Sequence, residues 1–379
     1  MTLVLNEEQL MLRDAAHDFL HSRSPVARLR ELRDGNESAG FSHDLWSEFA
    51  EMGWPAINIP ESYGGLEYGC TGLGIVLEEA GRTLASSPLI STALMGVTAL
   101  LESGNEALCE AWLPQLGSGE KLLALAIDEH RHHQPQSVGM SAQRNGDLFI
   151  LNGHKCLVLD GHVADGLIVS ARTSGETGDK AGISLFLLNR DLPGIEVERA
   201  TLLDNHSAAR ISFKDVQISA ASLLGQCDHG WPALEKTLDT GRIGIAAELL
   251  GIAQEVFERT MSYLKERTQF GVPVGSFQAL QHRAAILFGE IELCKSVVLK
   301  ALQAIDEGDE KLPVYASLAK ARSGETARLA TAEAIQMHGG IGMTDDFDIG
   351  FFIKRYQSLE QTLGNSNYHL ERFACLKSY

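Results

Sequence analysis

The chain has 379 residues, of which 44% are hydrophobic and 22% are charged, with 37 glycines and 10 prolines. This composition excludes a disordered, collagen-like or low-complexity protein, and the length allows two or three domains of about 100–200 residues each. The formal net charge of -18 disfavours nucleic-acid binding, because so acidic a surface repels phosphate backbones.

Secretion, membrane insertion and zinc-ribbon sites are disfavoured by three further features. The N-terminus, MTLVLNEEQL, has acidic residues where a signal peptide needs an apolar core, and the apolar stretch Leu89–Leu101 is too short to span a bilayer. The six cysteines lie far apart without a Cys-x-x-Cys pair, which is typical of a reduced protein. We therefore expect a cytoplasmic protein without a membrane span.

Residues 1–118 are predicted to form an N-terminal helical domain. An apolar stripe at three-to-four-residue spacing follows Asn6, a residue suited to an N-cap, and a second stripe begins at Leu45. Helices are expected again over about 72–83 and 89–116.

Residues 119–226 are predicted to form a middle β domain. Short apolar runs bounded by Gly, Pro, Asp or Asn indicate six or seven strands, which favours a small barrel or sandwich. These runs are Leu122–Ile127, Leu148–Ile150, Leu167–Val169, Ile183–Leu188, Ile195–Val197 and Ile211–Phe213. Asn145-Gly146 and Asn152-Gly153 are both hairpin-turn signals.

Residues 227–379 are predicted to form a C-terminal helical bundle. The apolar stripe from Leu287 to Ile305 steps by three or four residues, which requires a long helix with a buried seam. Pro313 is expected to begin the next helix, which ends near Met337. The layout is therefore α, then β, then α.

Four segments, in order and on this layout, carry a resemblance to a known family. They are Glu51-Met52-Gly53 followed by Ile59–Gly65; Asn152–Lys155 followed by Ala164-Asp165; Arg267–Gly271 with Phe277, Gln278 and His282; and Gln336–Gly342. Together they are similar to the signatures of the acyl-CoA dehydrogenases over essentially the whole chain. The resemblance implies that family's fold, with an N-terminal α domain, a middle β-barrel domain and a C-terminal four-helix bundle domain.

The resemblance also implies an activity. The family's subunits form tetramers, bind FAD and oxidise an acyl-CoA thioester, here in lipid or steroid catabolism, with no metal. A carboxylate removes the α-proton while flavin N5 accepts the β-hydride, and an electron-transfer flavoprotein or a similar acceptor takes the electrons. The α-proton is removable only because the thioester carbonyl is hydrogen-bonded and the flavin withdraws charge.

The adenosine end of FAD needs positive charge and backbone groups that approach the pyrophosphate closely. Arg267 provides the charge, and Gly339 and Gly340 allow the approach because they have no Cβ. The resemblance assigns three more residues to this end, namely Phe270, Gln278 and Gln336. It implies that the two glutamines bind from a neighbouring subunit. Taken alone, the glycine pair is better explained as a helix C-cap and Arg267 as a surface residue, but the surrounding match favours FAD.

The flavin-ring end departs from the family pattern. A Thr/Ser-Glu-Pro run and a following Gly-Ser-Asp are replaced by Ala126–Arg131, so Asp128 falls where a neutral hydroxyl normally meets the flavin. A Trp-x-Thr/Ser after the hairpin lysine is replaced by Cys156–Val158. The histidines of segment 130–133 invite a metal interpretation, but neighbouring loop histidines point in different directions, and we expect a solvated loop.

Both positions that the family uses for its catalytic base lack a carboxylate. The Glu of a Tyr-Glu-Gly-Thr/Ser run aligns with Leu363, and the alternative Glu before an Arg aligns with Gly241. Glu360 is a weak candidate that requires a shifted alignment, and we expect it to be a carboxylate on a helix surface; Asp239 is a similarly remote candidate. Arg242 is implied to line the acyl-CoA pocket; its alternative role is a buried salt bridge between helices.

Three functions remain open. The favoured one is a base-deficient partner subunit that shares FAD with a Glu-bearing subunit in a hetero-oligomeric acyl-CoA dehydrogenase, as among steroid side-chain and pimeloyl-CoA-type members. The second is a self-sufficient FAD-dependent dehydrogenase, a homotetramer, with a relocated base. The third is a non-enzymatic relative that binds acyl-CoA or nothing.

Overall fold

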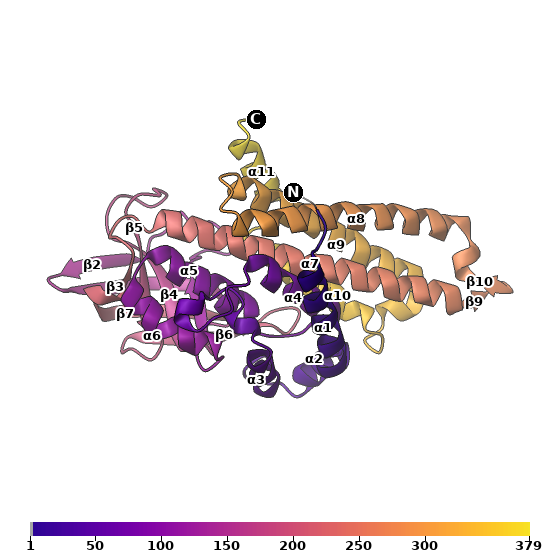
Figure 1. The fold of residues 1–379 in the computed structure, drawn as a ribbon, viewed down its shortest axis with the longest axis horizontal. Helices are drawn as coiled ribbons and strands as arrows, with labels where there is room; N and C mark the ends of the chain where they lie inside the picture. Colours follow the sequence, from indigo (N-terminus) through magenta and orange to yellow (C-terminus); the bar gives the residue numbers. More distant parts are fainter. Residues whose placement is uncertain (1–2) are drawn as a thin grey trace. The chain divides into compact units, whose positions relative to one another are not determined.

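The computed structural model describes residues 3–379, which divide into two compact units built from separate stretches of the chain. Unit 1 contains the chain up to Gly35 together with Cys70–Ser86 and Arg242–Tyr379, and unit 2 contains Asn36–Gly69 and Ser87–Gly241. Unit 1 is mostly helical, whereas unit 2 holds the large β-sheet (Figure 1).

Within its described residues, unit 1 consists of long and short helices and one short hairpin. Helix α7 enters it from unit 2, α8 packs on α9, and both α10 and α11 also pack on α9. The elements are α1 (Glu7–Arg23), α2 (Val26–Asp34), α4 (Cys70–Thr83), α7 (Trp231–Glu266), β9 (Thr268–Gln269), β10 (Val272–Pro273), η5 (Val274–Ser276), α8 (Gln278–Asp306), α9 (Leu312–His338), η6 (Gly339–Met343), α10 (Ile349–Gln361) and α11 (Ser366–Leu376).

The predicted helix ends in unit 1 are confirmed by their local chemistry. The Asn6 side chain accepts from the Gln9 N–H at 2.8 Å, and the Gln9 side chain accepts from the Asn6 N–H at 3.0 Å, which forms a capping box at the start of α1. Pro313 occupies the first turn of α9, where its missing N–H costs nothing. The predicted stripe on α8 is buried, including Leu287 and Val298.

Unit 2 consists of short helices and one eight-stranded sheet. The helices are α3 (His43–Glu51), η1 (Trp54–Ala56), η2 (Glu61–Tyr63), the π-helical η3 (Leu89–Gly96), α5 (Val97–Ser103), α6 (Glu106–Gly117) and η4 (Ala220–Ser222). The strands are β1 (Leu123–Ala126), β2 (Ser141–Asn145), β3 (Leu148–Leu159), β4 (Gly166–Arg172), β5 (Ile183–Asn189), β6 (Ile195–Thr201), β7 (Ser207–Ser219) and β8 (Leu223–Leu224). Their order is β6-β7-β3-β2-β4-β5-β8, with β1 paired in parallel to β4.

The interpretation of Asn152-Gly153 as a hairpin turn is wrong, because both residues lie inside the long strand β3. The Asn152 side chain accepts from the Asp215 N–H at 2.8 Å and donates to the Asp215 carboxylate at 3.0 Å, which stabilises a bulge between β3 and β7. Gly153 has a φ of 150°, and a Cβ there would collide with Met140. The two residues therefore mark a bulge, whereas Asn145-Gly146 does connect β2 to β3.

Among residues 3–379, no helix combines the length and the hydropathy that a membrane-spanning helix requires.

Candidate functional site

The residues assigned to the adenosine end of FAD lie around the ends of α7 and α9, both in unit 1. The Tyr263 ring near the end of α7 packs against the His338 ring with 4.4 Å between centroids, and its hydroxyl donates to the His338 carbonyl at 3.3 Å. Arg267 follows one helical turn after Tyr263, and Gly339 directly follows His338. The fold thus brings the Arg267 segment and the glycine pair to the same region.

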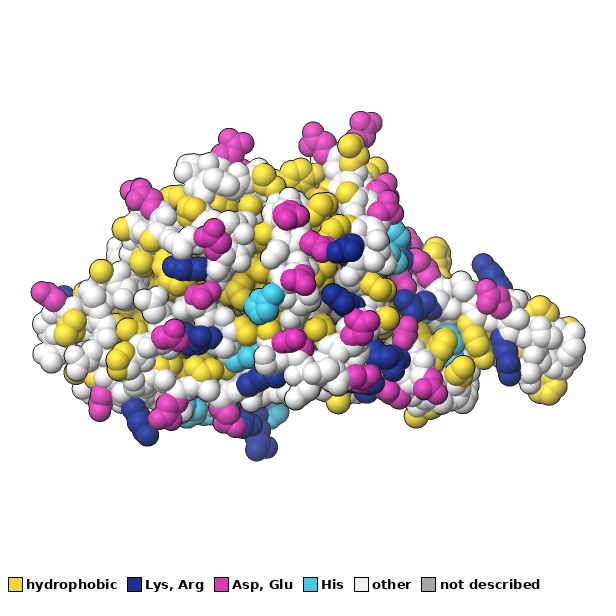
Figure 2. All heavy atoms as spheres, turned by 90° about the horizontal axis from the view of Figure 1, so that it is seen from below, with side chains coloured by type: hydrophobic (Ala, Val, Ile, Leu, Met, Phe, Trp, Pro, Cys, Tyr) yellow, Lys and Arg dark blue, Asp and Glu magenta, His cyan; other side chains and the backbone are white. Residues whose placement is uncertain are grey.

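The surface of this region is open. Phe270, at the tip of the β9–β10 hairpin, is 91% exposed, and Figure 2 shows hydrophobic side chains exposed at the end of unit 1 that this hairpin forms. Gly339 has a φ of 65°, and a Cβ added at Gly339 or Gly340 would meet no atom within 4 Å. All six residues predicted for this end are exposed: Arg267, Phe270, Gln278, Gln336, Gly339 and Gly340.

We call Thr362–Asn365, which connects α10 to α11 in unit 1, the base loop, because it aligns with the family's catalytic run. Leu363 and Gly364 both have left-handed backbones, with φ of 56° and 100°. A Cβ at Gly364 would collide with the Tyr368 ring, so the glycine is required by the close packing of this loop. Leu363 is half-buried, and its side chain has no atom that accepts a proton.

Three buried side chains hold the backbone of the base loop. Arg242 Nε and His369 Nε2 donate to the Leu363 carbonyl at 3.3 and 3.1 Å, and Lys320 Nζ donates to the Gly364 carbonyl at 2.9 Å. Burial lowers the pKa of Lys320 to about 8. Burial, with the charges of Arg242 and Lys320, holds the pKa of His369 far below its ordinary value, so its ring is neutral.

Two of these side chains were missed by the sequence analysis. Lys320 is fully buried on α9 among small side chains, and a lysine inside such a run is the signal that would have found it. His369 has no comparable pattern, because its position follows from the packing of α11. Arg242 is placed against the base loop as an anchor of its backbone, next to the buried Gly241 on α7.

The expectation that Glu360 lies on a helix surface is wrong, because the residue is buried, at 9% exposed. Its Oε1 accepts from the Ser366 N–H at 2.7 Å, and its main-chain carbonyl accepts from Lys320 Nζ at 3.1 Å. A carboxylate at a helix N-terminus satisfies backbone N–H groups and the helix dipole. Glu360 therefore has a structural role at the start of α11.

In unit 2, the residues assigned to the flavin-ring end are held within their own loop. The Cys156 N–H donates to the Asp128 carbonyl at 2.8 Å. The Asp128 carboxylate accepts from His133 Nδ1 at 2.8 Å and from the Gln134 N–H at 3.1 Å. His133 is buried, so the expected solvated loop is correct only for the exposed His130–His132.

A buried ion pair fixes the strand next to this loop. Lys155 Nζ lies 2.8 Å from Glu129 Oε1 and also donates to the Ile127 carbonyl and to Ser170 Oγ, both at 3.0 Å. Burial raises the pKa of Glu129, but Lys155, together with the backbone N–H groups of Met140 and Gly139, outweighs this effect and leaves that pKa lowered. Burial lowers the pKa of Lys155 in spite of its carboxylate partner. The Lys155–Glu129 pair therefore has a structural role, because it holds β3 against the segment that contains Asp128.

The two regions fit FAD differently. The adenosine end offers an exposed guanidinium, amide side chains and glycine backbone, which are the groups that a pyrophosphate and a nucleotide need. The ring end offers a carboxylate, which is engaged by His133, where the resemblance implies a neutral hydroxyl. The residues of this chain therefore fit the nucleotide part of FAD, while the ring part lacks its usual partners.

Family models match almost the whole chain: the acyl-CoA dehydrogenase N-terminal domain over residues 6–120, the middle domain over 129–216 and the C-terminal domain over 228–375. A cyclohex-1-ene-1-carbonyl-CoA dehydrogenase of Geobacter metallireducens is 31% identical over 89% of each chain.

Solved structures that share the fold include the following two. Butyryl-CoA dehydrogenase from Megasphaera elsdenii is 26% identical with a TM-score of 0.92, and covers 100% of both chains. A variant of the Tcur3481–Tcur3483 steroid ACAD is 31% identical with a TM-score of 0.87, and covers 100% of this chain and 99% of its own. The chain belongs to the acyl-CoA dehydrogenase family, whose members are FAD-linked oxidoreductases acting on CH–CH bonds.

Proposed function

We propose that this chain is the base-deficient subunit of a hetero-oligomeric acyl-CoA dehydrogenase, which shares FAD and an acyl-CoA substrate with a subunit that carries the catalytic Glu. The observation that carries the proposal is the base loop. Leu363 stands at the base position, and the four residues of the loop, Thr362–Asn365, include no acidic side chain.

The conformation of the base loop supports the proposal that this chain has no catalytic base. Arg242 and His369 both donate to the Leu363 carbonyl. Gly364 packs so closely on the Tyr368 ring that a Cβ at this position would collide with the ring. Glu360, the nearest acidic residue along the chain, caps α11 through Oε1. Its other oxygen, Oε2, is buried and would have to become accessible for Glu360 to act as the base.

The adenosine end supports a retained role in binding FAD. Arg267, Gln278 and Gln336 are exposed, and the backbone of Gly339 and Gly340 is open; these features have little use in a chain that meets no nucleotide. FAD, when bound, supplies the hydride acceptor of the reaction. In the proposed complex this chain binds and orients the nucleotide part, and the partner subunit supplies the proton acceptor and the contacts to the ring.

The partner chemistry follows from this division. The substrate class is an acyl-CoA thioester, and the partner is a family member with Glu before Gly in its base loop. The Tcur3481–Tcur3483 steroid ACAD, 31% identical, carries two component names, which is the kind of assembly proposed here. An electron-transfer flavoprotein or a similar acceptor would take the electrons from the complex.

The test is to purify the chain alone and together with a Glu-bearing relative encoded beside it, and to record the visible spectrum of each preparation. We expect flavin absorbance and acyl-CoA oxidation only when both chains are present. A stoichiometric flavin band and turnover from this chain alone would favour the self-sufficient enzyme. Absence of flavin from both preparations would favour the non-enzymatic relative.

A further inference from the structure

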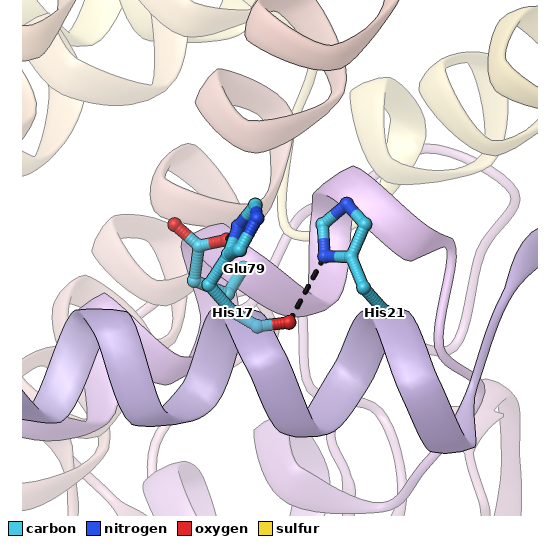
Figure 3. A group of neighbouring side chains, drawn as sticks. All are labelled: His17, His21 and Glu79. Atoms are coloured by element: carbon cyan, nitrogen blue, oxygen red, sulfur yellow. Dashed lines mark hydrogen bonds and ion pairs between the residues drawn. The ribbon is translucent and has the colours of Figure 1, made fainter.

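Helices α1 and α4 of unit 1 bring together two histidines and a carboxylate that the proposed dehydrogenase function does not use. His17 and His21 are four residues apart on α1 and therefore share one face of that helix. Both project toward Glu79 on α4 (Figure 3). One donor atom from each residue falls within 4.8 Å of the others. This is the spacing of side chains that can close around one ion.

The hydrogen bonds of the two rings orient them as metal ligands. His21 Nδ1 donates to the main-chain carbonyl of His17 at 3.0 Å, because a carbonyl can only accept, and this leaves Nε2 with the lone pair in the neutral ring. A metal-binding histidine usually has its second nitrogen fixed in this way. His17 Nδ1 donates to Glu79 Oε2 at 2.9 Å, so an ion that binds both atoms would replace the proton between them.

The charges around the cluster favour a cation. Glu79 is almost fully buried, and Glu255 Oε2 lies 4.0 Å from His21 Nε2 as a further oxygen donor. Arg82 contacts three carboxylates, those of Glu79, Glu255 and Glu258. The three carboxylates carry more negative charge than the Arg82 guanidinium balances, and this excess favours a further cation. Glu255 also pairs with a second arginine on α7, which reduces the excess.

A cleft beside the cluster gives solvent and ions access to it. Its volume is about 500 Å³, and its lining includes His17, His21, Arg82, Glu255 and Tyr263. His17 and His21 are also partly exposed, with 41% and 36% of their side-chain surfaces accessible. An ion held by three side chains at the wall of this cleft would have a further coordination position open to water.

We propose that His17, His21 and Glu79 form a binding site for a Zn²⁺-type divalent ion. Two histidines and one glutamate with an open position are a donor set that zinc takes in proteins, and imidazole nitrogen suits Co²⁺ and Ni²⁺ as well. The ion would join α1 to α4, two helices that pack on each other within unit 1. The proposal is independent of FAD and of the base loop.

The direct test uses the full chain, free of any histidine tag and treated with a chelator, which is then titrated with Co²⁺ by visible absorption and with Zn²⁺ by calorimetry. We expect saturation at one ion per chain. His17→Ala and His21→Ala should each weaken binding by roughly tenfold or more, as should Glu79→Gln. His132→Ala, a change at an exposed histidine of unit 2, should leave binding unchanged.

A thermal melt provides the second readout. One equivalent of Zn²⁺ should raise the Tm of the unmodified chain and of His132→Ala, but not that of the His17→Ala/His21→Ala double variant, because an ion that binds only the folded chain stabilises it. The proposal is overturned if the double variant binds as many ions with the same affinity. It is equally overturned if the unmodified chain takes up no ion.

Discussion

The adenosine end and the base loop differ in how function is distributed over residues. The adenosine end combines a guanidinium, two amides and glycine backbone, all exposed, so no single group decides whether a nucleotide binds. The resemblance to the family assigns one catalytic carboxylate to the base loop, and we place Leu363 at that position. A chain that evolves beside an active partner can therefore lose its chemistry in one step while it keeps its share of cofactor binding.

The largest effect is expected from breaking the buried ion pair that holds the altered ring end. Lys155→Met leaves the buried Glu129 carboxylate without its cation, which should lower the free energy of unfolding by about 3–5 kcal/mol. Chemical denaturation measures the change, and Lys214→Met, at an exposed position on β7 of the same sheet, is the matched control. Equal stability of the two variants would mean that Lys155 does not support this strand.

The second effect concerns the buried charge at the base loop. The pKa of Lys320 is lowered from 10.5 to about 8, so between pH 8 and 10.5 the unfolded chain binds a proton that the folded chain has lost. Stability therefore rises with pH in that window, by roughly 3 kcal/mol in total.

Lys320→Met removes this titration. The free-energy difference between the unmodified chain and the variant, measured by denaturation at pH 7 and at pH 10.5, should shift by that amount in favour of the unmodified chain. A difference that is independent of pH would show that Lys320 keeps its ordinary pKa and that the base loop is more hydrated than its contacts indicate.

The third effect sharpens the role of the adenosine end. Arg267→Ala in the two-chain complex removes a charge-assisted contact, and FAD should bind about 10–100-fold more weakly, equivalent to roughly 1.5–3 kcal/mol. Recovery of flavin fluorescence on dilution measures the affinity. Lys265→Ala, an exposed cation two residues away, should have no such effect. If both variants release FAD equally, only the general charge of this surface matters.

The smallest effect is expected from restoring the missing carboxylate. Leu363→Glu alone should give no dehydrogenase activity, because Asp128 and Cys156 still alter the ring end, and the nearby Arg242 and Lys320 would lower the pKa of the new carboxyl. Leu363→Gln, a change of the same size without charge, is the control. Strong acyl-CoA oxidation by the glutamate variant would show that the ring end is intact.

The order of elements could be predicted from the sequence because their signals are local. The cap at Asn6, the stripe on α8 and the proline at the start of α9 act within one or two helical turns. Asn152-Gly153 misled because Asp215, 63 residues away, converts a turn signal into a bulge.

The details of the candidate sites depend on contacts that local patterns do not contain. Glu360 is buried, and its Oε1 accepts from the Ser366 N–H at the start of α11. Lys320 meets the base loop 44 residues further along the chain. The spacing of His17 and His21 is visible in the sequence, but Glu79 joins them from a distance of 62 residues.

The most direct test of the division between nucleotide binding and proton abstraction is product formation by the isolated chain. The chain would be supplied with excess FAD, an artificial electron acceptor and a panel of acyl-CoA thioesters, and the 2-enoyl-CoA product would be measured by mass spectrometry. The account predicts no product above the protein-free control, and product once the Glu-bearing partner is added. Enoyl-CoA formed by this chain alone would contradict it.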